Sequence, residues 1–252
     1  MDIDFGRHIV EESTLLRSCA VGNLDVPIPT CGDWDMRALI EHVAFVFVER
    51  SACIHAGSDR GAFEEVQPTL GLPFDGPIES FDAAQVDLLK DFQGHEDADP
   101  AISWDGLDNT VGFWKRRVAH EVLTHRVDAE MALGVEISPI DAALAADGID
   151  EFLDTKLIYK SATQNDAIRD QLRSLEGVVV KFVCGDSERA VTVAVDGIAR
   201  APTGIEPHLT FSADPVRLNL WLWRRVDFDA IDISGSDELA RKFYQLSAFI
   251  GQ

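Results

Sequence analysis

Hydrophobic residues recur at helical spacing through the first two thirds of the chain, and after about residue 165 they gather into short valine-rich runs. Apolar residues three or four positions apart indicate amphipathic helices, whereas short β-branched runs bounded by glycine indicate strands. The pattern therefore predicts two domains, residues 1–165 and residues 166–252. The first is expected to be helical and the second to have an α+β fold.

Loops rich in proline, glycine and polar residues separate the helices of the first domain. Asp33 is a candidate N-cap, and Gly134 suits the left-handed turn that follows many helices. Helices joined by short to medium loops favour a bundle, and metal sites are commonly built inside bundles from facing helices. The predicted helices cover residues 8–20, 33–55, 81–92, 110–134 and 138–160.

In the second domain, two valine-rich runs at residues 177–183 and 191–195 flank Gly185-Asp186-Ser187, which predicts a β-hairpin. A further strand is expected at residues 208–212. Two helices should follow, one through residues 216–223 and the last at residues 236–249. This mixture of strands and helices predicts a domain with its own core.

Acidic residues outnumber basic ones, with 44 Asp and Glu against 22 Lys and Arg, a formal charge of −22. Nucleic acid and anionic membranes are therefore expected to be repelled.

The start of the sequence is not typical of a signal peptide, and no apolar run reaches the length of a membrane span, so a cytoplasmic protein is expected. The four cysteines include no C-x-x-C pair, which favours reduced thiols. Either a monomer or a homodimer is compatible with these features.

The helix around residues 114–128 carries two potential metal ligands. Glu121 and His125 are four residues apart and therefore share one face of the helix, where a carboxylate and an imidazole can bind one cation. His120 and Glu121 resemble the start of a His-Glu-x-x-His protease motif. However, His120 and His125 are five residues apart and diverge by roughly 140° around the helix, so a protease of that class is not expected.

A catalytic zinc needs a third protein ligand, and His42 is the best candidate. It lies on a predicted helix beside an apolar stripe formed by Leu39, Val43 and Val46. From these residues alone, His42 is as compatible with a hydrogen-bonded core histidine as with a ligand.

Three further features have two interpretations each. Cys31 is either a nucleophile or a loop residue before the second helix. Asp128 is either a partner that orients His125 or a member of a surface ion pair. Trp221 and Trp223 belong either to a packed amphipathic segment or to an aromatic binding surface.

Taken in order, several motifs resemble the mycothiol-dependent maleylpyruvate isomerase family. The resemblance implies an up-and-down four-helix bundle of the DinB-like type, followed by a smaller domain similar to sterol-carrier proteins. It also implies that His42, Glu121 and His125 hold a divalent metal, usually zinc, and that mycothiol is the thiol cofactor. The motifs are Cys31-Gly32-Asp33-Trp34, Glu41-His42-Val43, Arg116 to Asp128, Ala145 to Glu151, and Leu220 to Arg225.

Such a protein is expected to be a cis-trans isomerase or a thiol S-transferase that acts on a small electrophilic or dicarboxylic substrate. Arg225 and Arg224 are the candidates for binding a substrate carboxylate. In the family pattern a small residue usually precedes the arginine, so Arg225 matches that arginine better, and Arg224 departs from the pattern at the small position. The alternative is a non-catalytic protein that binds a small molecule or lipid, with a structural or vestigial metal site.

Overall fold

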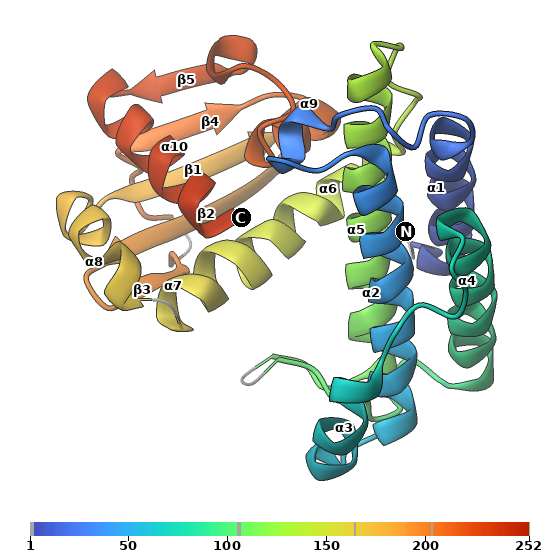
Figure 1. Ribbon diagram of the computed structural model, residues 1–252. Coiled ribbons are helices and arrows are strands. Elements are labelled where there is room, and N and C mark those ends of the chain that lie inside the picture. Colours follow the sequence, from blue (N-terminus) through green and yellow to red (C-terminus); the bar gives the residue numbers. More distant parts are fainter. Residues whose placement is uncertain (1–2, 105–106, 164, 203, 252) are drawn as a thin grey trace. The chain divides into compact units, whose positions relative to one another are not determined.

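The computed structural model describes residues 3–104, 107–163, 165–202 and 204–251, and its chain forms two compact units (Figure 1). The first unit ends at Pro139 and the second begins at Ile140. The order of helices and strands confirms the predicted fold class, a helical region followed by an α+β region.

Four long helices make up most of the first unit and lie side by side, with α1 packed on α5 and α2 packed on α4 (Figure 1). Apolar side chains from all four helices, such as Leu16, Phe47, Leu88 and Val122, are buried between them. This arrangement confirms a helical bundle. The helices of the unit are α1 (Phe5–Ala20), η1 (Pro29–Cys31), α2 (Met36–Ala56), α3 (Arg60–Val66), η2 (Gln67–Thr69), α4 (Pro77–Gly94) and α5 (Val111–Leu133).

Helix ends in this unit follow local capping chemistry. Thr110 caps α5 by accepting a hydrogen bond from the backbone of Phe113, and Gly134 ends that helix with φ of 65°, as predicted. The N-cap of α2 is Asp35 and not Asp33, because the Asp35 carboxylate accepts from the backbone of Ala38. The sequence pattern did not predict α3, which is short.

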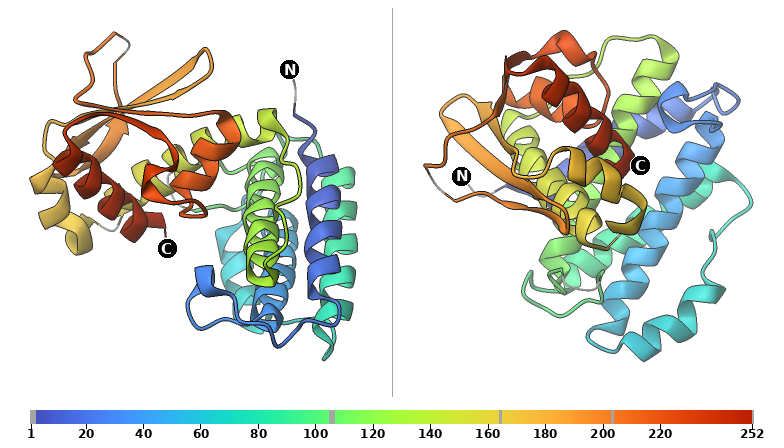
Figure 2. Two further views of the ribbon diagram at one scale, coloured as in Figure 1. Left: turned by 90° about the horizontal axis from the view of Figure 1, so that it is seen from above. Right: turned by 90° about the vertical axis from the view of Figure 1, so that its left-hand side faces the viewer.

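The second unit is a five-stranded sheet with helices on one face (Figure 2). The strand order is β3-β2-β1-β4-β5, and only the β1–β4 pair is parallel. The predicted hairpin joins β1 to β2 through Gly185, whose φ of 58° favours glycine. The elements are α6 (Ala142–Glu151), η3 (Phe152–Ile158), α7 (Tyr159–Thr163), α8 (Asn165–Ser174), β1 (Val179–Cys184), β2 (Ser187–Ala194), β3 (Gly197–Arg200), β4 (Leu209–Ser212), α9 (Pro215–Leu222), η4 (Phe228–Ala230), β5 (Asp232–Gly235) and α10 (Asp237–Gly251).

The boundary between the two units lies earlier than the predicted boundary at residue 165. Ile149, Phe152 and Leu157 are fully buried in the same core as the sheet residues Val180 and Phe182. The helical segment that the sequence pattern assigned to the bundle therefore packs in the second unit. Helical periodicity shows which face of a helix is apolar, but not which core that face joins.

Within the described ranges, no helix is long and apolar enough to cross a membrane.

Candidate metal centre

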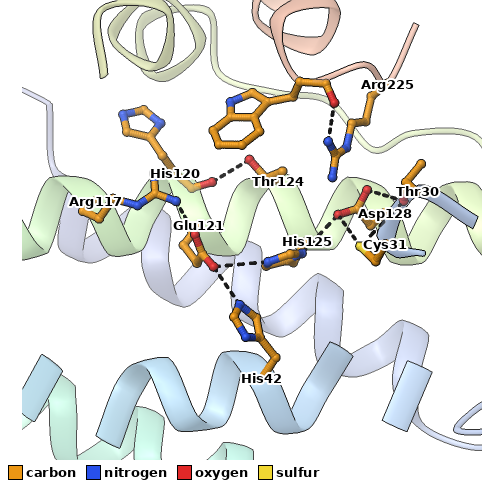
Figure 3. A network of polar contacts seen from close by, with 11 residues as sticks. Thr30, Cys31, His42, Arg117, His120, Glu121, Thr124, His125, Asp128 and Arg225 are labelled. Atoms are coloured by element: carbon orange, nitrogen blue, oxygen red, sulfur yellow. Dashed lines mark hydrogen bonds and ion pairs between the residues drawn. The ribbon is translucent and has the colours of Figure 1, made fainter. Parts of the chain in front are cut away.

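Two helices of the first unit bring the three predicted ligands together. His42 lies on α2, and Glu121 and His125 lie one turn apart on α5 (Figure 3). The Nε2 atoms of His42 and His125 are 2.9 Å and 3.2 Å from the same oxygen, Oε1 of Glu121. One ligand atom from each residue lies within 4.8 Å of the other two. Helical spacing sets the Glu121–His125 pair, and the packing of α2 and α5 adds His42.

The donor set fits a divalent metal such as zinc. Two imidazole nitrogens and one carboxylate oxygen are common zinc ligands. With bonds of roughly 2.0–2.2 Å, ligand atoms around tetrahedral zinc lie about 3.3 Å apart. The separations of 2.9 Å and 3.2 Å are close to that value, so small side-chain movements would admit an ion. Three protein ligands would leave one position of a tetrahedron for water, thiol or substrate.

Glu121 is held from its other side by Arg117, which precedes it by one helical turn. The guanidinium of Arg117 donates to Oε2 of Glu121, leaving Oε1 directed at the two imidazoles (Figure 3). Burial raises the pKa of Glu121, but the charge of Arg117 and the hydrogen bonds from His125 and His42 outweigh it. The pKa therefore lies well below the usual range, and Glu121 is a carboxylate.

The second nitrogen of His125, Nδ1, lies 3.1 Å from the fully buried carboxylate of Asp128. Burial lowers the pKa of His125, but its contacts with Asp128, Cys31 and Glu121 outweigh this effect and hold the pKa well above its ordinary value. A carboxylate on Nδ1 is the usual device that orients a metal-binding histidine through Nε2. Of the two interpretations of Asp128, the structure favours the partner of His125 over a surface ion pair.

A loop before α2 holds Asp128 in turn. Thr30 donates its hydroxyl to Oδ1 of Asp128 at 2.6 Å, and the thiol of Cys31 donates to Oδ2 at 3.5 Å. Both residues belong to η1, and the backbone N–H of Ile28 donates to the carbonyl of Trp34 and so closes this loop. Cys31 therefore contacts the site as a neighbour of Asp128, and it forms a second possible ligand group with His125 and Asp128.

Trp34 packs against the ligand imidazoles, with ring centroids 4.9 Å from His42 and 6.3 Å from His125. Sequence reasoning did not identify Trp34, Thr30 or Arg117 as part of the site. Two of them carried a signal: Arg117 precedes Glu121 by four residues on the same helix, and Trp34 belongs to one of the motifs that resemble the family.

His120 belongs to neither group of possible ligands found among the described residues. Its ring is buried, and its centroid lies 6.1 Å from that of Phe5 on α1. The structure thus separates His120 from His125, as their spacing predicted.

The two arginines named as candidates belong to the second unit, just after α9. Arg224 is the only non-glycine residue with a positive φ, 66°, among those the structure describes. Its guanidinium stacks 3.4 Å from the ring centroid of Tyr244 and donates to Oγ of Ser247 at 2.5 Å. The guanidinium of Arg225 donates to the carbonyl of Trp223 and lies 5.9 Å from the ring centroid of that residue. Arg224 is therefore anchored to α10, and Arg225 remains the better candidate for a substrate contact.

Comparison with known families supports the interpretation of the helical unit. Residues 9–130, which include His42, Glu121, His125 and Asp128, match the family described as the mycothiol maleylpyruvate isomerase N-terminal domain. The match covers most of the helical unit and slightly less than half of the chain. The resemblance that the sequence motifs indicated is confirmed there, and the name of the family associates this isomerase-type domain with mycothiol.

Comparisons with solved structures and with curated proteins add little about the second unit. A solved structure titled "UbiJ-SCP2 Ubiquinone synthesis protein" matches 43% of this chain and 96% of its own, at 17% identity and a TM-score of 0.31. A TM-score this low does not establish a shared fold. The similarity of the second unit to sterol-carrier proteins therefore stays a prediction. Comparison with curated proteins finds no match.

Proposed function

We propose that this protein is a metal-dependent enzyme that uses a low-molecular-weight thiol, mycothiol, to isomerise or S-transfer a small electrophilic substrate. The observation that carries the proposal is the convergence of His42, Glu121 and His125 within 4.8 Å inside a domain of the mycothiol maleylpyruvate isomerase family. A bound divalent ion such as zinc would lower the pKa of a thiol at its open position and so supply thiolate near neutral pH.

The side chains around the ligands keep this centre in one arrangement. Arg117 holds one oxygen of Glu121, and Asp128 holds Nδ1 of His125, so both ligands present their free atoms in a fixed direction. Thr30 and Cys31 keep the Asp128 carboxylate in place. The site therefore needs little rearrangement to accept an ion.

Arg225 is proposed to bind a carboxylate of the substrate. A guanidinium offers two parallel donors to a carboxylate, and a protein with a formal charge of −22 needs such a local positive charge to hold an anion. Arg224 has its donors directed at Ser247 and at the backbone of Tyr244 instead, so the proposal assigns it an anchoring role.

The first test is the metal content of the purified protein, measured by elemental mass spectrometry on wild type, His125→Ala and His120→Ala. We expect about one ion per chain in wild type, almost none in His125→Ala, and no change in His120→Ala. Circular dichroism confirms that each variant is folded. Loss of the metal in His120→Ala but not in His125→Ala would refute the ligand assignment.

The second test asks whether the metal serves thiol chemistry. Purified holoprotein is offered cis-dicarboxylic and other small electrophiles with and without mycothiol, and turnover is followed by absorbance and mass spectrometry. We expect turnover only when both thiol and metal are present. Loss of bundle stability on chelation with no thiol-dependent turnover would instead favour the binding-protein alternative.

A further inference from the structure

The thiol of Cys31 and the carboxylate of Asp128 lie on the side of His125 that faces away from Glu121 (Figure 3). Nε2 of His125 faces Glu121, whereas Nδ1 of the same ring lies 3.1 Å from Oδ2 of Asp128. Sγ of Cys31 is 3.5 Å from that same oxygen, and one ligand atom from each of these three residues lies within 4.8 Å of the other two. A second group of possible metal ligands therefore meets at the other nitrogen of the imidazole.

The separations in this second group are close to those around a tetrahedral ion. With a zinc–sulfur bond of about 2.3 Å and other bonds of roughly 2.0–2.2 Å, ligand sulfur and oxygen lie about 3.6 Å apart, and ligand nitrogen and oxygen about 3.3 Å apart. The observed distances are 3.5 Å from Sγ to Oδ2 and 3.1 Å from Nδ1 to Oδ2. Two of the three donor pairs are therefore already near ligand spacing.

The charges of the group suit a divalent ion that binds sulfur. One carboxylate and one thiolate offset the two positive charges of such an ion, and a thiolate ligand favours zinc or cadmium over magnesium and calcium. Thr30 donates to Oδ1 of Asp128 at 2.6 Å and so fixes the carboxylate with Oδ2 toward the ring and the thiol. Asp128 is fully buried and Cys31 is partly exposed, so the thiol side offers an entry path for an ion.

We propose that Cys31, His125 and Asp128 form a second metal site, which binds a thiophilic divalent ion and shares the imidazole of His125 with the first centre. Each nitrogen of the ring then holds one ion, and the ion at Nδ1 replaces the protons that the thiol and the ring share with Asp128. Because two cations on one ring repel each other, the second ion binds more weakly than the first. Binding of this ion requires no turnover, so it goes beyond the proposed thiol chemistry and is independent of it.

The experiment adds cadmium to the zinc-loaded protein in a buffer without thiols and follows the near-ultraviolet absorbance of a cadmium–thiolate bond. The first centre has no sulfur ligand, so this absorbance reports the second site. We expect the band in wild type, with about two ions per chain by elemental mass spectrometry, and its loss in Cys31→Ser, with about one ion per chain. Cys19→Ser, which removes another partly exposed thiol on α1, is the matched control and should behave like wild type.

His42→Ala separates the second site from the first. It removes a ligand of the first centre and none of the second, so the cadmium–thiolate band should persist in this variant. Failure of the proposed function therefore leaves this test intact. Circular dichroism confirms that each variant is folded.

A measurement on wild type alone locates the bound ion. Cadmium should protect Cys31, but not Cys19, from alkylation, as read by peptide mass spectrometry. The proposal would be overturned by the absence of the band in wild type at millimolar cadmium, by an undiminished band in folded Cys31→Ser, or by its loss in folded Cys19→Ser or His42→Ala. Equal alkylation of Cys31 with and without cadmium would also overturn it.

Discussion

The metal centre of the first unit and the turn after α9 in the second unit, formed by Arg224 and Arg225, are built in different ways. Glu121 and His125 are one regular helical turn apart, and α5 continues through both without interruption. Arg225 instead follows a left-handed arginine in the turn after α9. Regular helical spacing therefore reveals which two ligands share a face, whereas the backbone conformation of this turn does not follow from spacing.

The metal centre and this turn also differ in how their charges are compensated. Glu121 has the guanidinium of Arg117 and two imidazoles within contact distance, and the guanidinium compensates the negative charge of the carboxylate. The guanidinium of Arg225 instead donates to the carbonyl of Trp223, a residue of its own turn. The first arrangement suits a metal ion that replaces protons.

The largest expected effect is the loss of metal in His125→Ala, which should leave the proposed carboxylate contact of Arg225 intact. His125→Ala should remove almost all metal and leave binding of succinate, a small dicarboxylate, within about twofold of wild type, since the exchanged side chain belongs to the first unit only. Arg225→Gln should do the reverse, with full metal content and weakened succinate binding. Elemental mass spectrometry and calorimetry on the same preparations measure both. If either variant loses both properties while folded, the two sites are not independent.

The next effect concerns the hydrogen bond between Asp128 and the ligand His125. Asp128→Asn keeps the shape of the side chain but removes the charge that orients His125, so metal affinity should fall by about 10- to 100-fold. Competition with a chromogenic chelator measures this affinity. Asp87→Asn, an exposed residue paired with Lys90 on α4, is the matched control and should bind metal like wild type. An unchanged affinity in Asp128→Asn would show that the contact at 3.1 Å does not support the ligand.

A smaller effect is expected at the turn of the second unit. Arg224→Gly relieves the left-handed strain, about 1 kcal/mol, but loses bonds from a charged group, each about 1.5–3 kcal/mol. With the bonds to Ser247 and to the carbonyl of Tyr244 both lost, the free energy of unfolding should fall by about 2–5 kcal/mol, as measured by urea denaturation. Arg217→Ala, on the exposed face of α9, should change it by less than about 0.5 kcal/mol. A more stable Arg224→Gly would mean that strain outweighs the anchor.

The smallest effect concerns Cys31. Its thiol donates to Asp128, and a serine hydroxyl can do the same, so Cys31→Ser should keep the metal affinity of the first centre within about threefold of wild type. Thiol-dependent turnover should also persist, because the proposal takes the nucleophile from mycothiol. Turnover that disappears in Cys31→Ser with the metal retained would identify Cys31 as the nucleophile instead.

Features that are set within one helix could be predicted from the sequence. The i, i+4 spacing of Glu121 and His125, the exclusion of His120, and the caps Thr110 and Gly134 follow from local rules that act within one helix. The domain boundary did not follow in the same way, because the apolar face of residues 140–160 fits either core.

By itself, the sequence determined a helical region followed by an α+β region, the pair of ligands on one helix, and the excess of negative charge. These features depend on residue type and on spacing along one segment. Tertiary structure alone decided that His42 meets Glu121, that Thr30 and Cys31 hold Asp128, and that Arg224 bonds to Ser247. Each of these contacts joins segments far apart in the chain, so each depends on how helices pack and on irregular turns that no periodicity encodes.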